Sequence, residues 1–223
     1  MSVKLSFIIP VYNESSQIKQ CLTNLQTLRQ DGHEVIVVDG GSNDDTLSLA
    51  QPLCNVVITS EKSRAIQMNA GASKANGDYL LFLHVDTVIP ENTNELFSIL
   101  EKNHWGRFDV SLSGNHFMFR VIETCMNIRS RLSGIATGDQ VMFVDRELFI
   151  KIGGFPELAL MEDIAISKQL LQFSKPVCFS DKVVSSSRRW EKNGIIKTIL
   201  KMWYLRLLYF FDVDTNKLAK MYY

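Results

Sequence analysis

The residues best suited to chemistry, His84 and Asp86, follow an unbroken apolar run at residues 79–83. Such a run, bounded by turn residues, is typical of a strand buried on both faces of a parallel sheet. Because residues two apart in a strand share a face, a strand reaching Asp86 would point the imidazole and the carboxylate the same way. Together they could hold a divalent metal ion. An aspartate at a strand end also serves as a turn residue or helix cap, so both alternatives stay open here.

Acids and an amide end two other predicted strands. Asn13 and Glu14 follow a strand at residues 5–9, and Asp39 ends a strand at residues 34–39. Ligands of open α/β sheets bind beyond the carboxyl ends of the strands. We therefore predict a pocket suited to hydroxyls, a base N–H and a metal ion. Neither the dinucleotide fingerprint nor the Walker A motif occurs, so bare phosphate would need a cation or a basic group.

The first hundred residues alternate strand and helix, which predicts parallel βαβ units of a Rossmann-like half. We expect Pro10 to end the pairing of the first strand, Ser15 or Ser16 to cap the first helix, and Asp44 or Asp45 to cap a short helix from Thr46. The predicted elements are strands at residues 5–9, 34–39, 56–59 and 79–86 and helices at residues 16–31, from Thr46, and from Arg64 to Ala72.

The second half predicts further strands and helices around an acidic pair. Glu162 and Asp163 open a helix after Met161, where the helix dipole favours carboxylates. They are helix caps, or one of them faces the pocket as a general base. The other predicted elements are helices at residues 91–103, 120–132 and 195–211, strands at residues 110–112, 116–119, 141–144 and 183–187, and a turn at residues 153–155.

Composition limits the classes of function. The 223 residues have zero formal net charge and 46% hydrophobic content, as in a soluble globular protein without a nucleic-acid partner. The four cysteines, Cys21, Cys54, Cys125 and Cys178, fit no zinc or disulfide pattern, so we expect buried thiols in a reducing, cytoplasmic compartment. The N-terminus does not resemble a signal peptide, and no segment has the unbroken apolar length of a membrane span.

The predicted C-terminal helix at residues 195–211 has an apolar side and lies in a basic region. We expect this side to pack on the back of the domain. The alternative is that the helix, with Lys197, Lys201 and Arg206, lies on an anionic membrane as a peripheral contact at its inner face. That contact would bring the site to a lipid-linked acceptor.

Several motifs together resemble glycosyltransferase family 2, whose members have the GT-A fold. The resemblance covers roughly residues 5–190, and its L-H-x-D-T form is similar to a compact bacterial branch. The motifs are residues 7–14, residues 37–46, the pattern R-x-x-Q-x-N-x-G-A at residues 64–72, residues 77–79, and residues 153–155 followed by 161–163. A single GT-A domain is implied, with a nucleotide half at about residues 1–105, an acceptor half at about 106–190 and an amphipathic helix at about 191–211.

The resemblance implies an inverting hexosyl transfer from a nucleotide sugar, most simply a UDP-sugar. Asp86 would ligate Mn²⁺ or Mg²⁺ on the diphosphate, and Asp163, with Glu162 beside it, would act as the base. Asp39 would accept from the base N–H, and Glu14 would touch the ribose or base. The positions implied at the nucleotide are Pro10, Tyr12, Glu14, Asp39, Arg64, Val85 and Arg189.

This chain departs from the family pattern at two positions. His84 stands where the metal motif usually begins with aspartate; imidazole favours manganese over magnesium, or His84 makes no metal contact. Ser186 replaces the glutamine of the Q-x-x-R-W motif, so processivity is not implied. A nucleotidyltransferase and a non-catalytic sugar-nucleotide-binding protein are the alternative functions. The sugar, the acceptor and the oligomeric state are not specified by these residues.

Overall fold

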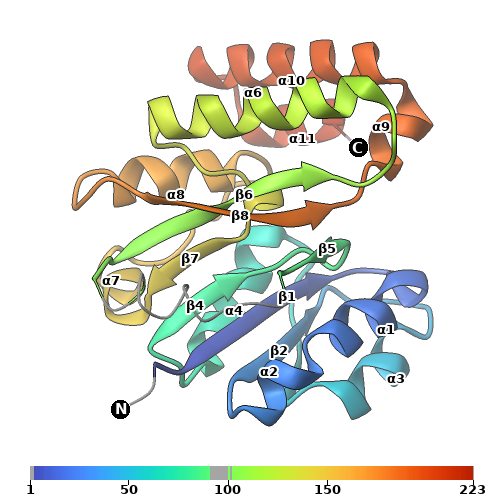
Figure 1. The fold of residues 1–223 in the computed structure, drawn as a ribbon, viewed down its shortest axis with the longest axis vertical. Coiled ribbons are helices and arrows are strands. Elements are labelled where there is room, and N and C mark those ends of the chain that lie inside the picture. Colours follow the sequence, from blue (N-terminus) through green and yellow to red (C-terminus); the bar gives the residue numbers. More distant parts are fainter. Residues whose placement is uncertain (1–2, 91–99, 101, 223) are drawn as a thin grey trace.

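The computed structural model describes residues 3–90, 100 and 102–222. Their strands form one eight-stranded sheet in the order β3-β2-β1-β4-β7-β6-β8-β5, flanked by helices on both faces (Figure 1). The strands are β1 (Leu5–Val11), β2 (Glu34–Asp39), β3 (Val56–Thr59), β4 (Tyr79–Phe82), β5 (Thr87–Val88), β6 (Trp105–Leu112), β7 (Met142–Asp145) and β8 (Val177–Ser185).

The first half follows the predicted parallel βαβ pattern. β1 pairs in parallel with both β2 and β4, and β2 pairs in parallel with β3. Its helices are α1 (Ser15–Asn24), α2 (Gln26–Gln30), α3 (Thr46–Ala50) and α4 (Arg64–Lys74), with a short 3-10 turn at Gln51–Leu53. β7 is antiparallel to β4 and β6, which joins the parallel half to the second half within a mostly parallel sheet.

Two predicted boundaries of this half are wrong. β1 continues through Pro10, which pairs with Val38. Proline is tolerated there because β4 pairs with β1 only as far as Ile8, so this end of β1 has a ladder partner on one side. α1 begins at Ser15 after Glu14 and has no side-chain cap. The N-cap position of α3 is Asp45, which makes no side-chain cap hydrogen bond, whereas the Oδ1 of Asp44 accepts from the Thr46 amide at 3.1 Å.

β4 ends at Phe82, so the predicted strand through Asp86 is also wrong. Phe82 is the last residue of β4 that pairs with β1 on one side and with β7 on the other. The chain then turns, and the Thr87 amide donates to the His84 carbonyl at 3.0 Å. β5 follows and pairs antiparallel with the end of β8. His84 and Asp86 therefore lie in a turn beyond the strand, and the alternation of strand faces does not apply to them.

The second half corrects two further predictions. The residues predicted as a strand at 116–119 begin α6 (Phe117–Ser133), whose N-cap His116 accepts from the Met118 amide through Nδ1 at 3.2 Å. β6 and β8 begin earlier than predicted, and the helix predicted at residues 91–103 lies outside the described residues. The remaining elements are a 3-10 turn at Gly138–Gln140, α7 (Arg146–Lys151), α8 (Glu162–Leu170), α9 (Arg188–Asn193), α10 (Ile195–Phe210) and α11 (Thr215–Tyr222).

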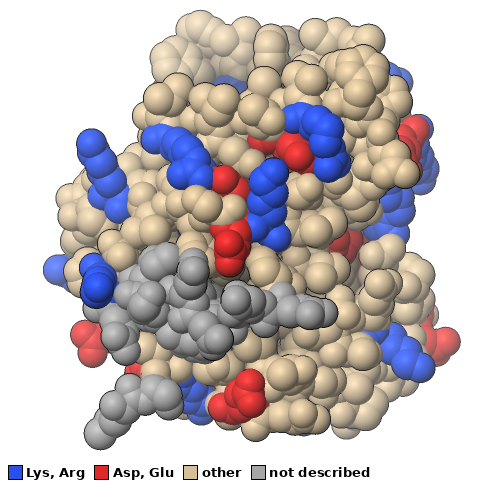
Figure 2. Space-filling view, viewed as in Figure 1, with Lys and Arg blue, Asp and Glu red and all other residues tan. Residues whose placement is uncertain are grey.

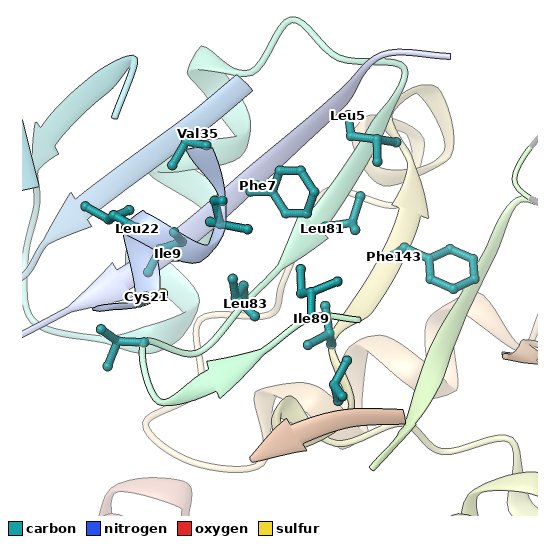
Figure 3. Close-up of a cluster of buried hydrophobic side chains, with 14 of the residues drawn as sticks. Leu5, Phe7, Ile9, Cys21, Leu22, Val35, Leu81, Leu83, Ile89 and Phe143 are labelled. Atoms are coloured by element: carbon teal, nitrogen blue, oxygen red, sulfur yellow. The ribbon is translucent and has the colours of Figure 1, made fainter. Parts of the chain in front are cut away.

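The central strands are mostly apolar because each is covered on both faces. Phe7, Leu81 and Phe143 belong to one cluster of buried side chains with the α1 residues Cys21 and Leu22 (Figure 3). The alternate strand residues Ile8, Val38, Leu80 and Phe82 pack on the other side, against residues of α4, α7 and α8. This two-sided burial fixes the sheet edge from which the site residues emerge.

The motif at residues 64–72 has a structural explanation. Gln67 Nε2 donates to the carbonyls of Val11 and Val38, at 2.8 Å and 2.9 Å, and so joins the ends of β1 and β2. Asn69 forms two hydrogen bonds with the backbone of Phe155, which fixes the predicted glycine turn at residues 153–155. A Cβ at Gly71 would lie 2.5 Å from Cγ2 of Ile8, so only glycine allows α4 this close to the sheet.

The apolar side of α10 is mostly uncovered, so the expected packing on the domain is wrong. Thr198 and Leu205 are the buried residues of this helix, whereas Trp203 is 68% and Phe210 is 74% exposed. Figure 2 shows few charged side chains at the end of the molecule where Figure 1 places α6 and α10. No helix among the described residues is both long and apolar enough to cross a membrane. The cysteine prediction holds for Cys21 and Cys54, which are buried, but not for Cys125, which is exposed on α6.

Candidate functional site

A cavity of about 930 Å³ lies beyond the carboxyl ends of β1 and β4 and extends to α8, α10 and α11. Its walls come from both halves of the chain, as the strand-end argument predicts. The predicted site residues that line it are Pro10, Tyr12, Glu14, Arg64, His84, Val85, Asp86, Glu162, Asp163 and Arg189. Asp39 is not among the lining residues.

Glu14 lies on the nucleotide side of the cavity, in a loop held by the neighbouring strand. The Asn13 amide donates to Ser42 Oγ, and the Glu14 amide donates to Thr46 Oγ1, both at 2.8 Å. Burial raises the pKa of Glu14, and the nearby charge of Asp86 raises it further. Arg188, whose Nη2 lies 3.9 Å from Glu14 Oε2, acts in the opposite direction. Two carboxylates thus lie at this wall, with the Arg188 guanidinium near one of them.

Asp39 is fully buried and holds the loop between β2 and α3. Its Oδ2 accepts from the amides of Gly41 and Ser42, both at 2.9 Å, and its Oδ1 accepts from the Ser42 hydroxyl. Gly41 has a φ of +88°, a conformation that glycine adopts without strain. The Asp39 carboxylate therefore shapes the loop behind the cavity, a role that its position at a strand end did not distinguish from direct binding.

An aromatic ring and cations form the outer part of the nucleotide side. The Lys62 ammonium lies 3.6 Å from the centroid of the Tyr12 ring, within cation–π range. Arg64 begins α4 and lines the cavity beside Ser63. Lys62 was not predicted, because the loop at residues 60–63 shows no motif that marks it.

His84 and Asp86 line the cavity but have different surroundings. The His84 ring lies against Gly138, where a Cβ would be 2.5 Å from Nε2, and its Nδ1 is 3.6 Å from Asp139 Oδ1. Asp86 is half-buried, and its charge adds to the effect of burial, the main cause that raises the pKa values of Glu14 and Cys21. No cluster of three His, Cys, Asp or Glu side chains with metal-site geometry occurs within the described part of the chain. The potential metal donors on this wall are the carboxylates of Asp86 and Glu14 and the His84 imidazole.

Glu162 and Asp163 begin α8 after Met161, which has a φ of +69°. Asp163 Oδ1 accepts from the Ile164 amide at 2.8 Å, and Oδ2 accepts from the Gly138 amide at 3.3 Å. Glu162 is buried, and burial together with the Asp163 charge raises its pKa. Asp163 therefore presents a hydrogen-bonded carboxylate to the cavity beside a carboxyl group that favours its neutral form.

The turn at Gly138–Gln140 connects the two acidic parts of the site. It contacts His84 through Gly138 and Asp139, and it donates to Asp163 through the Gly138 amide. Thr137 and Gln140 fix the turn through a capping box. These residues were not predicted as part of the site. The capping residues Thr137 and Gln140, three apart, are the signal that could have indicated a built turn.

Arginines form the far wall of the cavity. Arg189 stacks on the Tyr222 ring at 3.8 Å and donates to its hydroxyl. Arg206 lines the cavity from α10, and its buried Nε makes no hydrogen bond within the described residues; the same holds for Nε and Nη2 of Arg129. Burial lowers the pKa of Arg129 to about 10, with the Arg206 charge as the next cause. Arg129 was not predicted, and Arg206, expected beside Lys197 and Lys201 in the membrane alternative, instead lines the cavity. Both come from helices whose contacts a sequence pattern does not fix.

Comparisons with known proteins agree with this geometry. The model of the family "Glycosyl transferase family 2" matches residues 6–140. An uncharacterized glycosyltransferase of Haemophilus influenzae is 28% identical over 182 residues, 75% of this chain and 62% of that protein. Poly-beta-1,6-N-acetyl-D-glucosamine synthase of Staphylococcus aureus is 28% identical over 94 residues, 40% of this chain and 23% of the synthase. The chain thus spans less than two thirds of either relative.

Solved structures share the fold at low sequence identity. S. aureus TarS 1–349 in complex with UDP-GlcNAc superposes with a TM-score of 0.64 and 22% identity, covering 82% of this chain and 58% of that one. Mannosyltransferase PcManGT from Pyrobaculum calidifontis, in complex with GDP-Man and Mn²⁺, gives a TM-score of 0.63 and 20% identity, covering 83% and 57%. The mixed α/β architecture is therefore the GT-A fold of these glycosyltransferases. With the family model matching more than half of its residues, the chain belongs to glycosyl transferase family 2.

Proposed function

We propose that this protein is an inverting, metal-assisted glycosyltransferase that moves a hexosyl group from a UDP-sugar to an acceptor hydroxyl. One observation carries the proposal: a single cavity joins Asp86 and Glu14 of the nucleotide half to Asp163 of the acceptor half. The family membership and the ligands named for TarS and PcManGT support a nucleotide-sugar donor.

In this proposal the nucleotide occupies the cavity wall formed by the ends of β1 and β4. Tyr12, backed by the Lys62 ammonium, offers a ring face to the base, and Glu14 accepts from the ribose hydroxyls. Pro10 and Val85 form the apolar floor, and Asp39 acts indirectly by fixing the loop at Gly41 and Ser42. The guanidinium groups of Arg64 and Arg189 match phosphate oxygens.

Asp86 is the proposed metal ligand, with the diphosphate oxygens completing the coordination of Mn²⁺ or Mg²⁺. The carboxylate of Glu14 lines the same wall, and burial, with the Asp86 charge as a lesser cause, raises its pKa. The bound ion would stabilise the charge that develops on the leaving diphosphate. His84 either supplies a second ligand, which favours Mn²⁺, or holds the turn at Gly138 and Asp139 in place.

Asp163 is the proposed general base. As the bond between the sugar C1 and the UDP oxygen breaks, the acceptor oxygen bonds to C1 from the opposite face and its proton passes to Asp163. The amides of Ile164 and Gly138 hold the carboxylate in position. Glu162 lines the same cavity but is buried beside Asp163, so we assign the base to the carboxylate that the two amides orient.

The acceptor enters, in this proposal, along the wall formed by α10 and α11, where Thr198, Met202 and Tyr222 line the cavity. A lipid-linked hydroxyl compound fits best, because the outer side of α10 is apolar and exposed. The protein would then be cytoplasmic and peripheral on the inner face of the membrane. A non-catalytic sugar-nucleotide-binding protein is the alternative, and the retained carboxylate at Asp163 argues against it.

Substitution of Asp163 tests the catalytic part of the proposal. We expect Asp163→Asn to keep the thermal stabilisation by UDP and to reduce UDP release from the preferred UDP-sugar by about 10²–10⁴-fold, the usual effect of losing a general base. Glu157→Gln, which changes another carboxylate that lines the cavity, is the matched control and should stay active. Full activity of Asp163→Asn would contradict the assignment of Asp163 as the base. Absence of UDP-sugar turnover by the unaltered protein would favour the non-catalytic alternative.

A further inference from the structure

The outer side of α10 is a continuous stripe of large apolar side chains. Ile196, Leu200, Trp203, Leu207 and Phe210 are each more than half exposed. Their spacing of three or four residues places them on one face of the helix. The helix nevertheless contacts the rest of the protein through its opposite side, where Thr198, Met202 and Arg206 line the cavity.

α6 carries a second apolar stripe at the same end of the molecule. Phe117, Val121, Ile128 and Leu132 are all exposed, and Leu132 reaches 84%. The two helices are neighbours, because Phe119 and Ile122 of α6 cluster with Ile195 and Ile199 of α10. Figure 1 shows both helices along one end of the fold. These nine exposed side chains of the two helices form what we call the α6–α10 face.

The α6–α10 face gathers nine exposed large apolar side chains on two neighbouring helices, which indicates an interaction surface. Its charges select the partner. The segment from Gly194 to Phe211 contains no acid, and Lys197 and Lys201 are exposed along it. The acid of α6, Glu123, is buried and lies within 4 Å of Arg120 and Lys182. An exposed apolar and aromatic stripe bordered by lysines is typical of helices that lie in the surface of an anionic membrane.

A second copy of the chain, bound to the α6–α10 face, fits the residues of this face less well than a membrane does. Interfaces between proteins are depleted of lysine relative to the rest of the surface. A transmembrane anchor is excluded for the described helices, because none is long and apolar enough to span a bilayer. An anionic lipid surface fits the exposed residues of this face. It accepts the aromatic side chains among its headgroups and attracts the lysines.

We propose that the α6–α10 face docks on an anionic lipid bilayer, with Trp203, Leu207 and Phe210 inserted at the headgroup level. Docking itself needs no catalytic activity. The docked protein would receive a lipid-linked acceptor in the cavity, because α10 forms one wall of that cavity. This consequence of docking rests on the function proposed above. The inner side of α10 faces the site while its outer side faces the lipid, so one helix connects the bilayer to the acceptor end.

Vesicle flotation tests the docking directly. We expect the protein to float with phosphatidylcholine vesicles that contain phosphatidylglycerol, to float less with phosphatidylcholine alone, and to lose binding as salt is raised. The double variant Trp203→Glu/Phe210→Glu should stay in the bottom fraction. Ile150→Glu is the matched control: Ile150 is 64% exposed on α7, outside this face, and its variant should float like the unaltered protein.

Two further measurements separate the outcomes. Thermal stabilisation by UDP in the double variant shows that it is folded and that a loss of flotation is not a loss of the nucleotide site. Sedimentation without vesicles measures self-association. Absence of flotation by the unaltered protein overturns the proposal, as does equal loss in Ile150→Glu. A dimer that Trp203→Glu/Phe210→Glu dissociates, without vesicle binding, would assign the face to a second copy instead.

Discussion

At the scale of single residues, the site depends on how each carboxylate is compensated. Asp39 is compensated by loop hydrogen bonds and Asp163 by two amides, whereas burial outweighs the partial compensation of Glu162 by its backbone and by Arg64. Glu14 is partly compensated by the Arg188 charge, against burial and the Asp86 charge. Chemically similar acids at strand and helix ends therefore have different roles, which their spacing in the chain did not reveal.

The raised pKa of Glu162 makes a prediction about stability. Burial is the first cause of the raised pKa and the Asp163 charge is the second. The pKa of Glu162 in the folded protein therefore lies above its ordinary value of 4.5, and the folded protein binds this proton more tightly than the unfolded chain does. The ionised group consequently destabilises the fold at neutral pH, and this penalty decreases as the pH falls toward 4.5. We expect Glu162→Gln to raise the thermal midpoint at neutral pH, with a gain in unfolding free energy on the order of 1 kcal/mol.

Thermal melts across pH measure this effect. The advantage of Glu162→Gln should shrink on acidification and vanish below the unfolded pKa of the glutamate. Glu157→Gln, at a second acid of the cavity wall, serves as the control. A midpoint for Glu162→Gln that is unchanged or lower at neutral pH would contradict the assigned burial cost.

At the scale of elements, α4 shows why the motif at residues 64–72 contains a glycine. The Cβ of an alanine at position 71 would meet Ile8 at 2.5 Å and Val38 at 3.0 Å, both side chains of the packed sheet. We expect Gly71→Ala to destabilise the protein by about 1–3 kcal/mol, the usual cost of overpacking a core. Ser73→Ala, on the exposed side of the same helix, should change stability little. Denaturant unfolding would refute this account if the two variants behaved alike.

The parallel half was largely predictable from the sequence, and the reason is local. β2 and β3 have the predicted bounds, because unbroken apolar runs ending in turn residues mark strands, although β3 is an edge strand and only partly buried. The failures occurred where a distant partner decides the outcome. β4 stops at Phe82 because β1 and β7 stop pairing with it there, and α6 takes in residues 117–119 because His116 caps it.

At the scale of the whole molecule, the strand ends predicted where the cavity lies but not how it is closed. Ten predicted residues line it because parallel strands bring their carboxyl ends to one edge. The turn at Gly138 and the wall from Arg206 to Tyr222 come from helix packing, which has no local signature. The amphipathic pattern of α10 led us to expect that its apolar side packs on the domain, but that side is exposed. The pattern could not decide this, because it fits a helix packed on a core and a helix on a membrane equally well.

The most direct test of the central claim is a thermal shift with UDP, with and without Mn²⁺. If Asp86 holds a metal ion on the diphosphate, UDP with Mn²⁺ should stabilise the protein more than UDP alone, by ligand linkage. Asp86→Ala should remove the metal-dependent part of the stabilisation and keep the remainder. His84→Ala should reduce the response to Mn²⁺ if the imidazole is a ligand, and leave it intact if His84 only supports the turn. An unchanged metal response in Asp86→Ala, or no response to UDP in the unaltered protein, would contradict the account.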